Sequence, residues 1–582
     1  MENQKQVLEV AILDKHMEVT KLEWDLMERL RMDARAFEKS IAIAYFVLQL
    51  KKNDISINTD KSIKELCSVI QNQQIRGFIY EMLNGVEKSR IEGLFNYSEE
   101  ALTEYIVTTE DKSFDRGQEY LTPKCINQLA IEILGIEEGD TVVDNCMGIG
   151  SFIAEASKVQ PDASYCGVEI NHSVAAIAEM RLSLVKSDCH VVTGNALEDN
   201  FCGKQFNKGF SNYPFGMRIR TVSEDIGIID RINKTCPELS KGTSADWIFN
   251  YRLCEMLVPN GIGVAVMSLG GLWNTLDKPI RETFVKNGKV KAVIKLPAKL
   301  FPNTSIPVAM IVFGYNEGGI RFIDASNEYV EGRRQNSLNA QNIATIIDAL
   351  NTDSSISKLV SIEEIAENQF SFDPTRYNEV VEEIVDGVPF ETIIKSITRG
   401  APLAARDLDD IASVLPTDYQ YMMLANIKNG IIDKELPYLK EIPPRFEKYC
   451  IHKGNLLLSK NGYPFKVAVA EPPEDKTILA NGNLYVIVLD TEKVDPYYVK
   501  AFLESDQGIV QLKRITVGAT IPNIGVNQLN TIQIPLIPIE EQHKMALRYQ
   551  AVLDEIELMR RKIERAENSL KTIFSTKPEE EC

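Results

Sequence analysis

The segment from Thr141 to Phe152, TVVDNCMGIGSF, constrains the fold of this chain more than any other. It opens on three β-branched residues, which is typical of a buried strand. Gly148 and Gly150 allow a tight turn close to a ligand, because glycine carries no Cβ atom. Residues 151–159 then predict a helix whose N-terminus faces that ligand. Alone, this pattern also fits an ordinary βα turn, but it predicts the first unit of a doubly wound, Rossmann-like α/β sheet.

Polar residues end the next three predicted strands. Glu169 lies 19 residues beyond Gly150, a distance at which an acid is placed to hydrogen-bond ribose hydroxyls. Asn195 follows the third strand, and its amide offers a donor and an acceptor to an adenine edge. Asn212 follows the fourth strand. Polar groups at several strand ends predict a ligand at the carboxyl edge of a parallel sheet.

Later apolar runs complete the predicted sheet. Three further strands, at 263–269, 291–297 and 309–315, give about seven strands in all. A helix is predicted at 245–257, with the sequence VPNG as its C-terminal stop.

The sequence Asn212-Tyr213-Pro214-Phe215 suggests chemistry at an exocyclic amine of a base. The lone pair of such an amine is delocalised into the ring, so it attacks an electrophile poorly. Two acceptors, Asn212 Oδ1 and the main-chain carbonyl of Tyr213, would draw the nitrogen toward a tetrahedral shape. Pro214 favours extended backbone at Tyr213, and Phe215 offers a flat face to an extruded base. The alternative is a strand-end turn with a buried aromatic residue.

The region before the glycine turn is expected to be helical. Residues 1–105 show apolar residues at helical spacing, which favours a packing or docking domain. Thr122 is expected to cap a helix that has Pro123 at its first position. Tyr120, Leu121 and Thr122 then either form a lip over the ligand or simply begin a surface helix.

Five motifs in order resemble those of the modification subunits of type I restriction–modification systems: EYLTP at 119–123, DNCMGIGSF at 144–152, VEIN at 168–171, GNAL at 194–197 and NYPFG at 212–216. Those subunits are site-specific DNA adenine-N6 methyltransferases that use S-adenosylmethionine and serve restriction–modification or phage defence. The resemblance implies a class I methyltransferase domain over 106–385, with no metal. It implies catalytic roles for Asn212, Tyr213, Pro214 and Phe215. It implies cofactor binding by Tyr120, Leu121, Thr122, Pro123, Asp144, Gly148, Gly150, Ser151, Phe152, Glu169, Ile170, Asn195, Ala196 and Asn212.

The catalytic motif departs from the family pattern at one position. That pattern is Asn-Pro-Pro-Phe, and Tyr213 replaces its first proline. The carbonyl is kept, but rigidity is lost because proline fixes φ. Because of this departure, the second candidate function is that of a catalytically weak scaffold, which binds S-adenosylmethionine and DNA and recruits a partner nuclease. A third candidate function is methylation of a glutamine or asparagine amide in protein.

The C-terminal third alternates short β-type runs with turns. Residues 440–514 hold 11 Lys and Arg against 10 Asp and Glu in a chain of net charge −19, so this part repels phosphate least. Lys460, Asn461, Tyr463 and Lys466 could contact a DNA groove, or they are solvated loop residues. The segments at 454–470 and 518–542 resemble half of a type I specificity subunit. The resemblance implies a DNA target recognition domain over 386–540.

The last predicted element, 541–582, carries four heptads. Apolar residues alternate at spacings of four and three from Met545 to Ile573, which predicts a coiled-coil helix roughly 44 Å long. The stripe is either one side of an intramolecular hairpin or a seam between chains. Antiparallel pairing is favoured, with a second copy as a homodimer or with a separate specificity subunit.

The N-terminal sequence, the length of the apolar runs and the cysteine pattern indicate the cellular compartment. The polar start is unlike a signal peptide, and no apolar run reaches the length of a membrane span. The ten cysteines contain no CxxC pair, which predicts reduced thiols without a zinc site. We therefore expect a cytoplasmic protein. The family resemblance implies double-stranded DNA as its partner, association with the nucleoid and, as a further candidate, a nuclease subunit.

Overall fold

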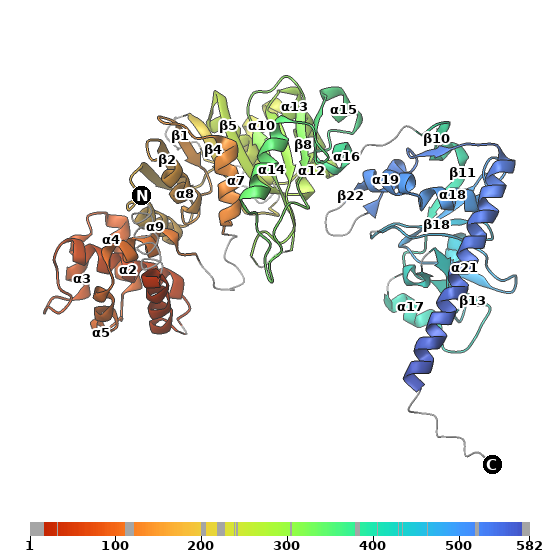
Figure 1. Ribbon diagram of the computed structural model, residues 1–582, viewed down its shortest axis with the longest axis horizontal. Coiled ribbons are helices and arrows are strands. Elements are labelled where there is room, and N and C mark those ends of the chain that lie inside the picture. Colours follow the sequence, from red (N-terminus) through yellow and green to blue (C-terminus); the bar gives the residue numbers. More distant parts are fainter. Residues whose placement is uncertain are drawn as a thin grey trace, which may run out of the picture. The chain divides into compact units, whose positions relative to one another are not determined.

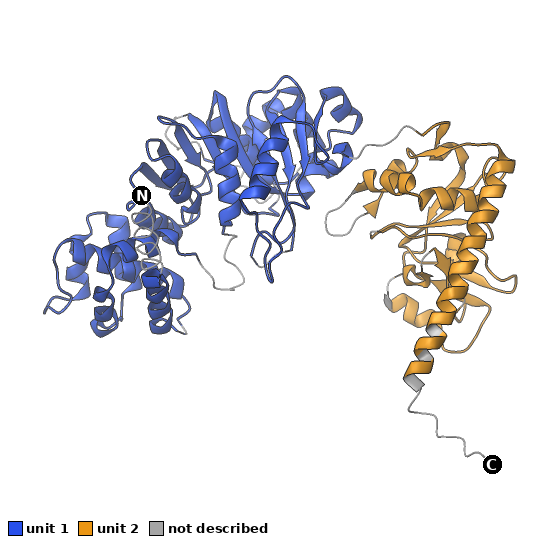
Figure 2. Cartoon of the chain, viewed as in Figure 1, with its two compact units in different colours: residues 1–378 blue, residues 379–582 orange. Residues whose placement is uncertain are grey.

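The computed structural model divides the chain into two compact units, residues 1–378 and 379–582 (Figure 2). The described residues are 17–31, 33–110, 121–198, 205–217, 227–237, 239, 243–302, 305–378, 384–403, 405–428, 430–433, 435–462, 464–517 and 523–572.

A nine-stranded sheet forms the centre of the first unit, with the order β3-β2-β1-β4-β5-β7-β6-β8-β9 (Figure 1). The strands from β3 to β5 run parallel, whereas β7 runs antiparallel between β5 and β6. The strand order reverses at β1, so the loops after β1 and β4 diverge there, where ligands bind in open α/β sheets. The strands are β1 (Thr141–Asp144), β2 (Ser164–Glu169), β3 (Asp188–Thr193), β4 (Phe206–Ser211), β5 (Leu257–Ser268), β6 (Val290–Lys295), β7 (Val308–Phe313), β8 (Ile320–Asp324) and β9 (Ser357–Val360).

Helices cover both faces of this sheet, which explains why a strand such as β7 is apolar and buried at every position. Val142 packs into one core and Val143 into the other, because successive side chains of a strand point to opposite faces. The first face is covered by α7 (Lys124–Leu134), α8 (Ser151–Val159), α9 (His172–Leu182) and α14 (Ala340–Asn351). The second face is covered by α10 (Ile228–Thr235), α11 (Asp246–Met256), α13 (Lys278–Lys286) and α15 (Ile362–Glu367).

Two expectations about this sheet were wrong. The sheet has nine strands rather than about seven; β8 and β9 are only five and four residues long, which gives a weak periodic signal. The VPNG sequence lies inside β5, which begins at Leu257 immediately after α11. There Phe206 pairs with Leu257 but Lys208 pairs with Ile262, so the turn residues form a bulge in a strand.

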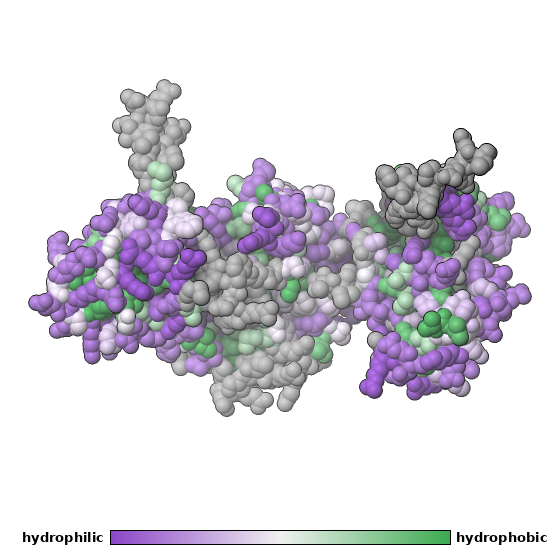
Figure 3. All heavy atoms as spheres, turned by 90° about the horizontal axis from the view of Figure 1, so that it is seen from below, coloured by the Kyte–Doolittle hydropathy of each residue, from purple (hydrophilic) through white to green (hydrophobic). Residues whose placement is uncertain are grey.

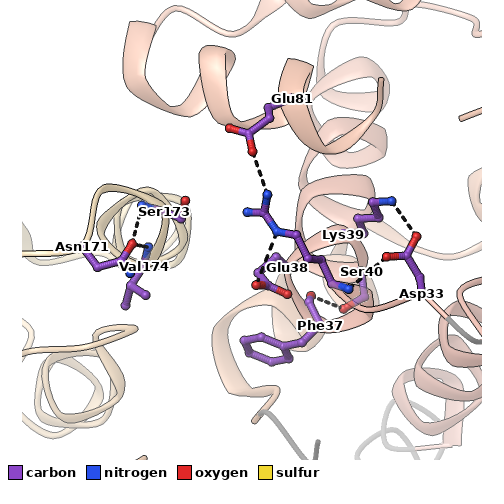
Figure 4. Close-up of polar contacts among 10 residues, drawn as sticks. Asp33, Phe37, Glu38, Lys39, Ser40, Glu81, Asn171, Ser173 and Val174 are labelled. Carbon is purple, nitrogen blue, oxygen red and sulfur yellow. Dashed lines mark hydrogen bonds and ion pairs between the residues drawn. The ribbon is translucent and has the colours of Figure 1, made fainter. Parts of the chain in front are cut away.

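The N-terminal helices pack against α9, one of the helices that cover the sheet. Their apolar core continues into Ala176, Ile177 and Met180 of α9. Gln74 Nε2 also donates to Thr193 Oγ1 at 3.0 Å, at the end of β3. Ion pairs such as Arg35–Glu81 join these helices to one another (Figure 4). The elements are a helix over residues 17–29, α2 (Ala36–Lys52), α3 (Ile63–Leu66), α4 (Gln73–Met82), α5 (Lys88–Glu92) and α6 (Glu99–Thr108).

The second unit contains a four-stranded sheet, a five-stranded sheet and a long helix, besides the two-stranded pairs of β10 (Gly387–Pro389) with β24 (Gln533–Pro535), β14 (Ile427–Lys428) with β15 (Ile431–Ile432) and β22 (Thr516–Val517) with β23 (Asn523–Ile524). One sheet has the order β11-β21-β18-β19 and the other β12-β16-β13-β20-β17. Their strands are β11 (Ile394–Arg399), β12 (Ala412–Ser413), β13 (Tyr419–Met422), β16 (Tyr438–Leu439), β17 (Cys450–Ile451), β18 (Leu456–Ser459), β19 (Val467–Val469), β20 (Thr477–Ala480) and β21 (Leu484–Leu489). The helices are α17 (Ala405–Ile411), α18 (Pro496–Leu503), α19 (Asp506–Arg514), α20 (Val526–Leu529) and α21 (Ile539–Thr572).

Among its described side chains, those at the start of the long helix α21 hold it to the rest of the second unit. Gln542 and Ala546 are buried, and the Tyr549 ring lies under the Lys500 ammonium of α18 at 4.7 Å. Further along, the predicted heptad stripe is exposed at Val552, Ile556, Met559, Ile563 and Leu570. Within the described residues no other helix covers this stripe, so the intramolecular hairpin does not form there.

The fold class expected from the sequence is confirmed: helical N-terminus, Rossmann-like sheet, strand-rich C-terminal unit and long final helix. Among the described helices, none is both long and apolar enough to span a membrane. In the view of Figure 3, hydrophilic residues dominate the described surface, with smaller hydrophobic patches between them.

Candidate functional site

The glycine turn after β1 lies at the point where the strand order reverses. Gly148 and Gly150 both adopt positive φ, +54° and +76°, which residues with a Cβ atom rarely adopt. Gly150 is the N-cap of α8, so the free N–H groups of that helix begin at Ser151. Beside the turn, the Asn145 N–H donates to the Phe210 carbonyl of β4 at 3.3 Å, which holds the ends of β1 and β4 together.

Asp144, at the end of β1, is a buried acid without a cationic partner among the described residues. It is 2% exposed and accepts a hydrogen bond from the Cys146 N–H at 3.1 Å. Burial raises the pKa of Asp144 to about 8, and the nearby Glu169 carboxylate adds to the rise. A positively charged ligand at this position would stabilise the ionised form.

Glu169 connects the end of β2 to the glycine turn. Its Oε2 accepts from the Gly148 N–H at 3.1 Å, and its Oε1 accepts from the Asn171 N–H at 2.8 Å. The Asn171 side chain in turn caps α9 by accepting from the N–H groups of Ser173 and Val174 (Figure 4). These bonds fix the carboxylate of Glu169 at the carboxyl edge of the sheet.

Ile170, between these two residues, is an exposed apolar side chain at that edge. It is 63% exposed, although the residues on either side of it are held by hydrogen bonds. A flat ligand such as a purine would cover it and remove apolar surface from water. The exposure of Ile170 therefore fits a contact with the base of a nucleotide-like cofactor.

Asn195 and Ala196 follow β3 along the same edge. Asn195 Oδ1 accepts from the Leu197 N–H at 3.1 Å, which leaves the Nδ2 group as the donor available to a ligand. Ala196 is 6% exposed and packs against Val168, so its methyl group lies in the core. Its main-chain carbonyl accepts from Arg252 Nε at 3.1 Å, so what Ala196 can offer a ligand is its N–H.

The loop after β4 brings Asn212 to Thr122. Asn212 Nδ2 donates to Thr122 Oγ1 at 2.8 Å, across 90 residues of sequence. This bond directs the amide so that Asn212 Oδ1 becomes the remaining acceptor. That oxygen is buried and accepts no hydrogen bond within the described residues. An unpaired buried acceptor is costly, which indicates that a ligand donor completes it.

Tyr213 points away from Asn212, into the core beneath α11. Its hydroxyl donates to Asn250 Oδ1 at 2.9 Å, and its ring stacks on Phe249 with centroids 5.0 Å apart. Burial raises its pKa far above the usual value, so the phenol stays protonated. After the half-buried Pro214, the Phe215 ring meets Phe301 edge-on with centroids 5.7 Å apart.

Several proposed site residues differ from expectation. Thr122 does not cap α7: Pro123 is the N-cap residue, and no side chain caps this helix. The Thr122 hydroxyl is turned to Asn212 instead. The Phe152 side chain is 1% exposed and stacks on Phe210 at 4.2 Å, so it belongs to the core. Leu121 packs against the N-terminal helical core, and Tyr120 lies outside the described residues.

Sequence reasoning missed three polar residues at this edge. Asn145 is 1% exposed, and neither polar atom of its side chain has a partner in the described part of the chain. The Ser211 hydroxyl, at the end of β4, is buried and unpaired in the same sense. Asn250 is the third. Of the three, Asn145 carried the clearest signal, because it lies in the DNCMGIGSF motif directly after Asp144.

The second unit brings two cations together near the loop that starts β21. Arg399 Nε donates to the Gly482 carbonyl at 2.7 Å, and Asn461 Nδ2 donates to Asn483 Oδ1 at 3.2 Å. Burial and the nearby Arg399 lower the pKa of Lys460. Neither cation forms an ion pair with a described carboxylate. Of the other residues expected here, Lys466 Nζ donates to the Leu424 carbonyl, and Tyr463 lies outside the described part.

The roles of Phe152 and Ile170 can be separated by stability. Phe152→Ala should lower the free energy of unfolding by about 3–5 kcal/mol, because it opens a cavity under β4. Ile170→Ala should change it by no more than about 0.5 kcal/mol, because that side chain is exposed. Denaturant unfolding of the two variants measures both values. A small effect of Phe152→Ala would contradict its assignment to the core.

Two family models match the chain in separate regions. Residues 99–385 match the N-6 DNA Methylase family, and residues 415–568 match the Type I restriction modification DNA specificity domain. The first match includes the glycine turn and the loop after β4. The second includes Lys460 and most of α21.

Curated relatives of the two regions are separate proteins. The Type I restriction enzyme MpnII methylase subunit of Mycoplasma pneumoniae is 28% identical over 56% of this chain, and the chain covers 62% of that relative. The MjaIX methylase subunit of Methanocaldococcus jannaschii is 25% identical over 49% of this chain and 55% of the relative. The MjaVIII specificity subunit of the same organism is 25% identical over 22% of this chain and 32% of the relative. The chain thus spans less than two thirds of these relatives. Its residues 99–385 belong to the N-6 DNA methylase family and its residues 415–568 to the type I DNA specificity domain, fused in one chain.

Proposed function

We propose that this protein is a site-specific DNA adenine-N6 methyltransferase that acts within a restriction–modification or phage-defence system. Its substrates are S-adenosylmethionine and an adenine flipped out of double-stranded DNA. The observation that carries the proposal is Asn212 Oδ1, a buried acceptor without a described partner, directed by the bond from Nδ2 to Thr122. It requires a donor, and the amino group of an adenine is one.

The residues at the sheet edge fit S-adenosylmethionine, which carries positive charge, a ribose and an adenine. Asp144 is an acid whose burial favours a cationic neighbour. We assign Glu169 to the ribose hydroxyls, because its carboxylate is held at the sheet edge, and we assign Ile170 and Asn195 Nδ2 to the adenine. When bound, this cofactor supplies an electrophilic methyl group.

In the proposed mechanism, Asn212 Oδ1 and the Tyr213 carbonyl accept the two hydrogens of the target amine. This pairing orients the nitrogen lone pair and reduces its delocalisation into the ring. Phe215, braced by Phe301, offers its ring to the extruded base. The amine loses its proton to solvent after the attack, so no general base of unusual pKa is needed.

Methylation is tested with labelled S-adenosylmethionine and DNA of mixed sequence. We expect label in DNA as N6-methyladenine, and a loss of about 10²–10³-fold in kcat for Asn212→Ala, the size seen when one preorganised polar group is removed. Asn212→Asp keeps two acceptor oxygens and should retain more activity than Asn212→Ala. Label on protein alone would favour amide methylation, and its absence from every acceptor would favour the catalytically silent scaffold.

Cofactor binding is expected to depend on the protonation of Asp144. Its pKa of about 8 in the folded protein exceeds the usual 3.8, so burying the group lowers stability increasingly as pH rises from about 4 to 8. A cationic ligand must displace the proton. Affinity for S-adenosylmethionine should therefore rise by up to about tenfold per pH unit between pH 6 and 8. Calorimetry would detect the released proton.

The matched control is Asp144→Asn, which keeps the shape but cannot ionise. Its affinity should be weaker at pH 8 and nearly independent of pH. If the wild-type affinity is equally independent of pH, Asp144 does not face the positive charge of the cofactor.

The second unit is proposed to recognise the DNA sequence. Arg399 and Lys460 bring two positive charges together without a described acidic partner, which suits a phosphate. Asn461, held by Asn483, is an amide of the kind that reads base edges. A chain with this function is expected at the nucleoid, and a nuclease subunit remains the proposed partner for DNA cleavage.

The exposed stripe of α21 is proposed to pair antiparallel with α21 of a second copy. A helix of 34 residues is about 51 Å long. Its a and d positions carry Val552, Ile556, Met559, Ile563 and Leu570 to solvent. Since each chain holds one recognition domain, an antiparallel pair would present two half-sites separated by the length of the helix.

Pairing is tested by sedimentation of the full chain and of matched helix variants. The wild type is expected to be a dimer, and Ile556→Glu and Ile563→Glu should be monomers because they place charge in the seam. Leu558→Glu is the control, since Leu558 is 56% exposed but lies off the stripe. A monomeric wild type, or equal effects of all three variants, would contradict the proposed seam.

A further inference from the structure

Position 213 is where this chain departs from the Asn-Pro-Pro-Phe pattern that its motif resembles. A proline there would fix φ, the torsion that sets how residue 213 continues from Asn212. Pro214 restricts residue 213 to extended backbone and so limits its ψ, which directs the carbonyl. With tyrosine at 213, φ is free unless contacts of the side chain hold it.

Such contacts come from α11. The Tyr213 hydroxyl donates to Asn250 Oδ1 at 2.9 Å, and the ring stacks on Phe249 at an interplanar angle of 16°. Tyr213 is 2% exposed and Asn250 fully buried. The hydroxyl and the ring of Tyr213 therefore each have a partner on α11.

Asn250 is itself held in the orientation that this bond needs. Its Nδ2 lies 3.7 Å from the Met267 thioether sulfur of β5, a weak acceptor. The amide nitrogen therefore faces Met267, and the carbonyl oxygen faces Tyr213. The loop follows β4, and β4 pairs directly with β5, which carries Met267. Asn250 and the loop are therefore held by neighbouring strands of the same sheet.

We propose that Asn250 and Phe249 are positioning residues that hold the main-chain carbonyl of Tyr213 toward the target amine, in place of the rigidity of proline. Fixing the Cβ atom of Tyr213 fixes φ, and Pro214 limits ψ, so the carbonyl keeps one direction. The neighbouring Asn212 is held independently by Thr122. This inference rests on the proposed methyltransferase function.

A double-mutant cycle in the full chain tests the proposal. Asn250→Leu removes the acceptor, and kcat at saturating S-adenosylmethionine and DNA should fall by about 10-fold or more, because small misplacements of reacting groups are costly. In the Tyr213→Pro background the pyrrolidine ring of the proline fixes φ. Asn250→Leu should then change kcat by less than about twofold. The KM values and cofactor affinity should stay near those of the wild type in each case.

Tyr105→Phe is the matched control for loss of one buried phenol bond. Tyr105 is 1% exposed and donates to Ser40 Oγ at 2.8 Å within the N-terminal helices. Like Asn250→Leu, it should lower the melting temperature, because a buried hydrogen bond is lost, yet it should leave kcat unchanged. Equal losses of kcat from Asn250→Leu in both backgrounds, or a wild-type kcat in Asn250→Leu, would overturn the proposal.

A second readout separates this inference from the proposed function. Amide hydrogen exchange of the peptide covering 205–217 should be faster in Asn250→Leu than in Tyr105→Phe, and slow again in the double variant Tyr213→Pro/Asn250→Leu. If the wild type transfers no methyl group to DNA but this exchange pattern appears, the proposed function is wrong and the positioning role of Asn250 is supported. Unchanged exchange in Asn250→Leu would overturn that positioning role, whatever the activity.

Discussion

Contacts from both faces of the sheet hold the loop after β4, and the geometry of the candidate site depends on these contacts. Asn212 is tied to Thr122, which precedes α7 on one face. Tyr213 is tied to Asn250 of α11 on the other. Two adjacent residues can do this because their side chains point to opposite sides of extended backbone. With its amide held by Thr122, Asn212 Oδ1 is left as a buried acceptor without a described partner.

The same edge collects groups that are unfavourable without a ligand. Asp144 is a buried acid with a raised pKa, and Asn212 Oδ1 is a buried acceptor without a described partner. Each would be stabilised by a different part of the proposed substrates, a positive charge and an amine. Perturbed titratable groups and unpaired buried atoms are common features of functional sites. Here they occur at two adjacent strand ends, β1 and β4, where the sheet order reverses.

The sequence predicted the sheet well because its determinants are local. The β-branched strand, the positive-φ glycines and the helix from Ser151 to Val159 lie within 20 residues, and α8 has those bounds. The bulge at VPNG and the short β8 and β9 were missed, because strand pairing overrides turn propensity and four residues carry little periodicity. Thr122 was misassigned as a cap since its real partner, Asn212, is 90 residues away. Asn250 gave no signal at all, because only the fold brings α11 beneath the loop.

The most direct measurement of the central claim is a structure of the protein with target DNA and a cofactor analogue. We expect N6 of an extruded adenine to lie about 2.7–3.2 Å from both Asn212 Oδ1 and the carbonyl oxygen of Tyr213. Thr122 should still contact Asn212 Nδ2, and Asn250 the Tyr213 hydroxyl. An adenine that stays in the duplex, or an Asn212 oxygen turned away from the amine, would contradict the account.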